Sequence, residues 1–141
     1  MMMEILFKSC VFHYEFDFIH PFSDGNGRMG RFFQTAILAK WESIFAYLPI
    51  ESIIKERQLE YYKAITDSHV AGNSNIFIEF MLAAILETIK RFTTDVQKED
   101  IFSSVQVEKL LNIMDDERPY TTKKLMELTH EEMYILLFLV Y

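Results

Sequence analysis

The clearest pattern of hydrophobic and polar positions lies between residues 77 and 92. Apolar side chains recur there at steps of three and four residues, while charged side chains occupy the other positions. This period matches the turn of an α-helix, so the segment predicts an amphipathic helix with one face in a core. That face comprises Phe77, Phe80, Met81, Ala84, Ile85, Thr88, Ile89 and Phe92.

Further helices are predicted on both sides of the chain's glycine-rich stretch. Residues 3–18 are dense in apolar side chains and favour a buried helix, although periodicity alone leaves a buried strand open. A helical pattern runs over residues 28–41, and another runs over residues 49–65. Residues 71–75, AGNSN, are typical of a turn.

The remainder of the chain predicts a linker and an appendage. Residues 93–104 are polar and charged, and two short helical patterns follow over 105–114 and 121–128. With only four glycines and three prolines, the chain has few places for the tight turns of a many-stranded β fold. We therefore expect an all-α protein, with a core over residues 1–95 and a short helical segment within residues 96–141.

Composition narrows the setting of the protein. The formal net charge of −7 provides no general basic surface, which disfavours nucleic acid as a partner. Cys10 is the single cysteine and lies in an apolar run, so we expect a core residue in a reducing compartment. No apolar run reaches the roughly 18 residues of a membrane helix, and Glu4 and Lys8 interrupt the first one. The sequence favours a cytoplasmic protein.

The candidate chemistry is concentrated in residues 20–31, HPFSDGNGRMGR, which contain three of the four glycines. His20 offers an imidazole, and Pro21 disfavours helical geometry at the residue before it. Asp24 offers a carboxylate oxygen of the kind that Mg²⁺ prefers. Taken singly, each has an ordinary structural explanation, such as a packed histidine or a helix cap.

The same stretch contains anion-binding groups. Gly25, Asn26 and Gly27 can present successive N–H groups, because glycine and asparagine tolerate positive φ. A helix that begins near Gly27 would direct those groups at an anion. Arg28 and Arg31 are three residues apart and can reach the same side of that helix, although either could be a surface charge. Together these groups predict a polyphosphate site beside a base.

This stretch resembles the Fic family motif, His-Pro-Phe-x-(Asp/Glu)-Gly-Asn-(Gly/Lys)-Arg-x-x-Arg, at every fixed position. Tyr61, Tyr62 and residues 72–80 resemble downstream segments of the family, so the resemblance covers about residues 5–92. It implies a partial Fic-like helical bundle that uses ATP and Mg²⁺. The implied reaction transfers AMP to a Ser, Thr or Tyr hydroxyl of a target protein.

The resemblance also implies roles for single residues. His20 would deprotonate the target hydroxyl, Phe22 would anchor the loop in the core, and Asp24 would bind Mg²⁺. The other implied roles are an anion hole of Gly25, Asn26 and Gly27, a β-phosphate contact by Arg28, a γ-phosphate contact by Arg31, and an adenine-side contact by Tyr61 or Tyr62. Core packing explains either tyrosine equally well. Gly27 favours AMP transfer, since a toxin subgroup that transfers the terminal phosphate carries Lys there.

The chain departs from the family pattern in two places. Only 19 residues precede His20, so we expect it to lack the family's upstream helices and β-hairpin flap, which aligns the target. The family's inhibitory motif, (Ser/Thr)-x-x-x-Glu-(Gly/Asn), is also unmatched, because Arg57 follows the partial spacing of residues 52–56. Any inhibition is therefore expected from missing sequence or from a separate inhibitory chain.

The C-terminal segment leaves further alternatives open. Residues 117–125 resemble the start of a winged-helix domain, while the apolar residues 133–141 could pack on the core, form a homo-oligomer contact or end as poorly ordered chain. Three functions compete: an AMP-transferring enzyme, a non-catalytic remnant that binds nucleotide or a partner, and a DNA-associated regulator acting through residues 99–141. The intact motif favours the first, the short N-terminus favours the second, and the acidic charge disfavours the third.

Overall fold

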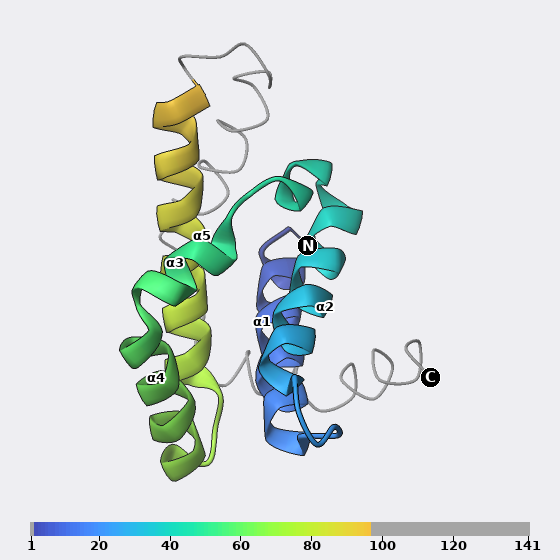
Figure 1. The fold of residues 1–141 in the computed structure, drawn as a ribbon, viewed down its shortest axis with the longest axis vertical. Helices are drawn as coiled ribbons and strands as arrows, with labels where there is room; N and C mark the ends of the chain where they lie inside the picture. The colour runs from blue at the N-terminus through green and yellow to red at the C-terminus, as the bar shows by residue number, and fades with distance from the viewer. Residues whose placement is uncertain (1, 97–141) are drawn as a thin grey trace.

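The computed structural model describes residues 2–96, and the side chains of residues 4–94. It contains α1 (Met2–Ile19), α2 (Asn26–Trp41), the short 3-10 helix η1 (Ser43–Ala46), α3 (Ile50–Glu56), α4 (Gln58–Ala71) and α5 (Asn75–Val96) (Figure 1). None of the described residues forms a strand, and the all-α prediction is confirmed for them. The linker residues 97–104 and the two short helices expected further on lie outside the described residues.

Helix α1 lies between α2 and α5, and this position explains its unusual sequence. Helix α2 returns beside α1 on one side, and α5 packs against α1 on another (Figure 1). Leu6 and Cys10 are fully buried, as is the polar His13. A helix covered on more than one side needs apolar residues around much of its circumference, so it shows no narrow apolar stripe. The helix predicted over residues 3–18 is confirmed, and the strand alternative is excluded.

Helix α5 provides the long apolar face of the core. Phe77, Met81 and Ile85 on this face have no exposed surface, and Ile89 is 1% exposed. Removing a side chain of this size from water contributes about 1.5–3 kcal/mol. The helix runs on through Val96, so residues 93–96 are helical, although the polar pattern predicted a linker there. The helix continues past the last buried residues because its backbone hydrogen bonds continue along the chain.

The single helix expected over residues 49–65 is wrong, because the chain forms α3 and α4 with a corner at Arg57. The Arg57 guanidinium carbon lies 5.1 Å from the centroid of the Phe80 ring on α5. Its Nη1 lies 3.4 Å from a carboxylate oxygen of Glu87, also on α5, and its Nη2 donates to Glu60 over 2.6 Å. The contacts with Phe80 and Glu87 hold the corner against α5. They are tertiary, so a helical period could not reveal them.

The turn expected over residues 71–75 is confirmed between α4 and α5. Gly72 ends α4 with φ of 67°, a left-handed conformation that glycine adopts without a side-chain clash. The amide of Asn73 donates to the carbonyl of Ser68 over 3.2 Å, which satisfies a carbonyl at the helix end. The hydroxyl of Ser68 in turn accepts from the amide of Phe77 over 3.0 Å. These bonds fix α5 against α4.

Helices α1 and α2 approach each other closely at Gly30. A Cβ atom at this position would lie 2.9 Å from Cδ2 of His13. The His13 ring cannot move away, because its Nδ1–H donates to Gln34 Oε1 over 2.7 Å and its Nε2 lies 3.1 Å from the hydroxyl oxygen of Tyr61. The missing side chain at Gly30 is therefore what allows the two helices to pack around this ring.

Cys10 is a core residue, as its apolar surroundings in the sequence indicated. The side chain is fully buried, and Gln34 Nε2 donates to its sulfur over 3.3 Å. Burial raises the pKa of the Cys10 thiol to about 12, so the thiol stays protonated at neutral pH. No helix in the described part of the chain combines the length and the apolar character needed to cross a membrane.

Replacing Gly30 with alanine is expected to destabilise the protein by about 1–3 kcal/mol, the usual cost of overpacking a core. At an ordinary position inside a helix the same change stabilises by roughly 0.5–1 kcal/mol. Denaturant unfolding of Gly30→Ala measures the sign. In a His13→Ala background, which removes the colliding ring, the added methyl group should cost much less. A Gly30→Ala protein more stable than the wild type would contradict the packing described above.

The buried His13 predicts a specific pH dependence of stability. Burial lowers the pKa of His13 from 6.5 to about 4, so the unfolded chain binds a proton at pH values where the folded chain does not. The free energy of unfolding should therefore fall as the pH drops from 6.5 to 4, by roughly 3 kcal/mol from this residue. Denaturant unfolding across this range checks it. His13→Gln should show a shallower slope, and equal slopes for His13→Gln and wild type would refute the assignment.

Candidate functional site

His20 immediately follows α1 and turns the chain away from it. Its φ is 52°, the only positive φ at a non-glycine residue among those described, and its side chain is exposed. The expected departure from helical geometry before Pro21 is confirmed. The His20 amide still donates to the carbonyl of Phe16 over 3.1 Å, which ties the histidine to the last turn of α1. The imidazole is thus accessible to solvent while its backbone is anchored.

Asn26 closes the loop that follows His20. Its side chain is 1% exposed; Oδ1 accepts from the amide of Phe22 over 2.9 Å, and Nδ2 donates to the carbonyl of Phe22 over 2.6 Å. Sequence reasoning considered only the backbone of Asn26 and missed this role. The signal available was the residue type, since an amide side chain can donate and accept at once.

Phe22 does not anchor the loop through its ring, and that expectation is wrong. The residue is 49% exposed, and its ring centroid lies 6.1 Å from that of Phe16 at the edge of the core. The loop is held instead by the backbone of Phe22, which both bonds of Asn26 reach. A hydrogen-bonded backbone needs no buried ring to fix it, so the residue pattern alone could not distinguish the two arrangements.

Helix α2 begins at Asn26, close to the start expected near Gly27. Gly25 precedes it with φ of 85° and ψ of 7°, a left-handed conformation suited to glycine. No side chain caps the helix, and Asp24 Oδ1 accepts instead from the amide of Gly25 over 2.7 Å. The first amides of α2 therefore lack a side-chain cap, and the helix dipole favours an anion beside them.

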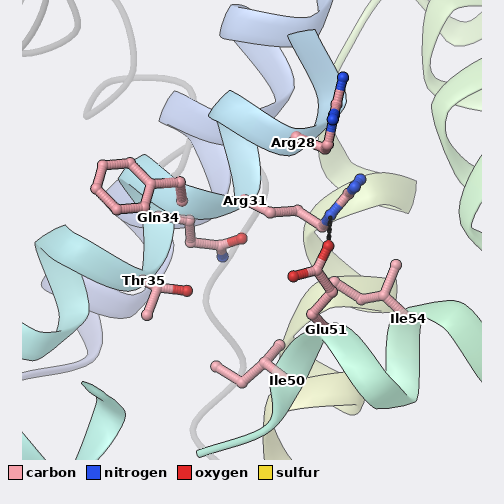
Figure 2. Close-up of a pocket in the computed structure, with 8 residues that line it drawn as sticks. Arg28, Arg31, Gln34, Thr35, Ile50, Glu51 and Ile54 are labelled. Atoms are coloured by element: carbon pink, nitrogen blue, oxygen red, sulfur yellow. Dashed lines mark hydrogen bonds and ion pairs between the residues drawn. The ribbon is translucent and has the colours of Figure 1, made fainter. Parts of the chain in front are cut away.

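Arg28 and Arg31 extend from the same side of α2 and line one pocket (Figure 2). Arg28 has 72% of its side chain exposed and its Nη2 lies 3.6 Å from Asp24 Oδ2. Arg31 has only 21% exposed, and its Nε donates to Glu51 Oε1 over 3.1 Å. Glu51 comes from α3 and was not found by sequence reasoning, since nothing local to residue 51 points to residue 31.

The pocket has a volume of about 310 Å³ and lies between α2 and α3. Its polar end carries the two arginines and Glu51, while isoleucines of α3 form an apolar side (Figure 2). The lining residues are Arg28, Arg31, Phe32, Gln34, Thr35, Ile50, Glu51 and Ile54. His20, Asp24 and the two tyrosines do not line it. The structure thus brings the two cations together and leaves the histidine on the neighbouring loop.

Tyr61 and Tyr62 occupy different environments on α4. Tyr61 is 2% exposed and its hydroxyl donates to Asp17 Oδ2 over 2.9 Å, so core packing accounts for it. Tyr62 is 55% exposed, and its hydroxyl accepts from Gln58 over 3.4 Å. The Arg31 guanidinium carbon lies 5.9 Å from the centroid of the Tyr61 ring. Tyr62 is the member of the pair that a bound molecule can reach directly.

Asp24 is compatible with a magnesium ion that takes most of its ligands from a substrate. Its carboxylate is 92% exposed and, among residues 2–96, is engaged by the neighbouring Gly25 amide and, at 3.6 Å, by Arg28. Within residues 2–96 there is no group of three or more His, Cys, Asp or Glu side chains able to hold a metal ion. Mg²⁺ commonly binds through one or two carboxylates together with substrate phosphates, which this arrangement fits.

Comparison with known proteins identifies a matching family model and relatives of this chain. A model of the Fic/DOC family matches residues 2–38, which include the whole His20–Arg31 stretch. A probable protein adenylyltransferase of Aquifex aeolicus is 27% identical over 79% of this chain and 40% of its own length. The protein adenylyltransferase fic-1 of Caenorhabditis briggsae is 29% identical over 65% of this chain and 17% of its own length.

A solved structure agrees with the sequence comparisons. The crystal structure of a Fic family protein from Desulfovibrio desulfuricans G20 matches with a TM-score of 0.62 and 40% sequence identity. The match covers 77% of this chain and 37% of that protein. The chain thus spans well under half the length of each of these three proteins. The family match over residues 2–38, the relatives named protein adenylyltransferases and the solved Fic family structure together show that this chain is similar to proteins of the Fic/DOC family.

Proposed function

We propose that this chain binds ATP and transfers AMP to a Ser, Thr or Tyr hydroxyl of a target protein. The observation that carries the proposal is an exposed imidazole, His20, beside a left-handed Gly25 that opens the uncapped N-terminus of α2. Arg28 and Arg31 project from the first turns of that same helix. The relatives named protein adenylyltransferases support the same reaction.

His20 is proposed as the general base. It takes the proton of the target hydroxyl, whose oxygen forms a bond to the α-phosphorus of ATP. The bond between that phosphorus and the oxygen bridging to the β-phosphate breaks, and pyrophosphate leaves with the electron pair. A positioned base contributes about 10²- to 10⁴-fold. The exposure of His20 suits this role, because the hydroxyl arrives on another protein.

The phosphates are proposed to bind where α2 begins. The amides of Gly25, Asn26 and Gly27 form the anion hole, Arg28 contacts the β-phosphate and Arg31 contacts the γ-phosphate. Phosphoryl-type transfer depends mainly on such positioning and charge stabilisation. Gly27 keeps the space beside the first turn open, since a Cβ there would lie 3.2 Å from Arg31 Nη1.

Two further contacts complete the proposal. Asp24 would hold Mg²⁺, which would offset the negative charge of the α- and β-phosphates. Tyr62 is proposed for the adenine side, because it is exposed on α4 whereas Tyr61 is buried. The hydroxyl is the one part of the target protein for which a contact is proposed.

Transfer from ATP labelled at the α-phosphate tests the proposal. The wild-type chain with Mg²⁺ and cell lysate should place label on protein, and His20→Ala should lose at least about 100-fold in rate, since the base is gone. Mg-ATP affinity measured by calorimetry should change little. His69→Ala, which removes another exposed histidine, is the matched control and should retain activity. Label from the γ-phosphate but not the α-phosphate would contradict AMP transfer.

The loop closure by Asn26 generates a second prediction. Asn26→Ala removes both bonds to the Phe22 backbone and leaves a polar site next to the anion hole unsatisfied. Stability should fall by about 1–3 kcal/mol, and Mg-ATP affinity should fall with it. Asn73→Ala, which loses side-chain bonds in the turn far along the chain, should affect nucleotide affinity little. Unchanged ATP affinity in folded Asn26→Ala would show that the closure does not organise the site.

A further inference from the structure

The Arg31 guanidinium is supported by an aromatic ring in addition to its ion pair with Glu51. Its ion pair with Glu51 is peripheral, because 70% of the Glu51 side chain is exposed and water screens the pair. Its other support is the Tyr61 ring on α4, whose centroid lies 5.9 Å from the guanidinium carbon. A cation near an aromatic ring is attracted by the ring's electrons. Because Tyr61 is 2% exposed, this support is part of the core rather than of the surface.

The Tyr61 hydroxyl is held between two groups of α1. It donates to Asp17 Oδ2 over 2.9 Å, and its oxygen lies 3.1 Å from His13 Nε2. His13 Nδ1–H donates to Gln34 Oε1, so in the neutral ring Nε2 carries a lone pair. Both neighbours of the hydroxyl therefore compete for its one proton. Burial raises the pKa of Tyr61, and the charge of Asp17 adds to this, so the phenol keeps that proton.

The neighbours of Arg31 also determine where the terminal nitrogens of its guanidinium lie. Nε is occupied by Glu51, and Nη1 lies near the position that a Cβ of Gly27 would take, at 3.2 Å. The terminal nitrogens are thus beside the first turn of α2, where the amides favour an anion. Figure 2 shows the guanidinium at this end of the pocket, with its bond to Glu51. Glu51 accepts from Nε, so this bond leaves the two Nη groups to other partners.

We propose that Tyr61 is a positioning residue that fixes the guanidinium of Arg31 for polyphosphate binding, and that Asp17 and His13 act by holding Tyr61. This inference rests on the proposed function, in which Arg31 contacts the γ-phosphate. In this proposal Asp17, His13 and Tyr61 position a binding residue in addition to packing beneath α2. The ring sets where the guanidinium lies, and the hydroxyl bonds set where the ring lies.

The test compares Tyr61→Phe with Tyr47→Phe. The first keeps the ring and removes the buried hydroxyl, while the second removes the hydroxyl of a tyrosine that is 64% exposed and does not line the pocket. Calorimetry measures the Kd of each protein for Mg-ATP and for Mg-ADP, which lacks the γ-phosphate. Tyr61→Phe should weaken ATP binding by about tenfold, the size of one hydrogen bond to a charged group, and leave ADP binding unchanged. Tyr47→Phe should keep the wild-type ratio of the two Kd values.

Two results would overturn the proposal. Equal weakening of ATP and ADP would mean that Tyr61 only supports the fold, and an unchanged Kd for ATP would mean that it does not position Arg31. Thermal unfolding establishes that each variant is folded. If Tyr61→Phe does not fold, Asp17→Ala takes its place, because it removes the carboxylate that accepts the hydrogen bond of the hydroxyl. It should shift the ATP-to-ADP ratio in the same direction, and an unchanged ratio would overturn the proposal.

Failure of the proposed function is distinguishable from failure of this inference. If the wild-type chain binds neither nucleotide, the proposed function fails, and the positioning is then read from the NMR signal of the Arg31 Nε–H group. That signal should shift in Tyr61→Phe and stay in place in Tyr47→Phe, because only the first change frees the ring beneath Arg31. An unchanged signal in Tyr61→Phe would overturn the positioning role without reference to nucleotide.

Discussion

The contact between the buried His13 ring and the bare backbone of Gly30 sets the distance between α1 and α2, and the site is built on that distance. With the helices this close, the six residues from His20 to Gly25 suffice to join them. The same ring contacts Gln34 on α2 and Tyr61 on α4, so three helices share one polar centre in an otherwise apolar core. Buried polar groups are costly unless they are satisfied, and here each ring nitrogen has a neighbour within hydrogen-bond distance.

The connecting loop owes its shape to two left-handed residues and one amide. His20 and Gly25 have φ of 52° and 85°, and Asn26 closes the turn through the backbone of Phe22. The helix start that results faces solvent without a side-chain cap, so a chain with net charge −7 still offers a local site for an anion. Helices on both sides support the loop, an arrangement that would suit the proposed reaction, which depends on positioning.

Much of the fold followed from the sequence because its information is local. The period of residues 77–92 defined the buried face of α5, and the turn at Gly72 needed only glycine's conformational freedom. The twelve residues of the motif were recognisable because base, carboxylate, glycines and arginines are adjacent in the chain. The corner at Arg57 was not recognisable, since Phe80 and Glu87, which hold it, lie on another helix.

The sequence by itself therefore determined that α1, α2 and α5 are helices, the turn after α4 and the content of the motif, because helix formation and glycine conformations depend on neighbours within a few residues. Only the tertiary structure decided how those groups are held. It exposed Phe22, placed Glu51 on Arg31, and put Tyr61 beneath the guanidinium while leaving Tyr62 outside. The two contacts of Arg31 join residues 20 and 30 positions apart, and such pairings depend on the packing of whole helices, which no local pattern encodes.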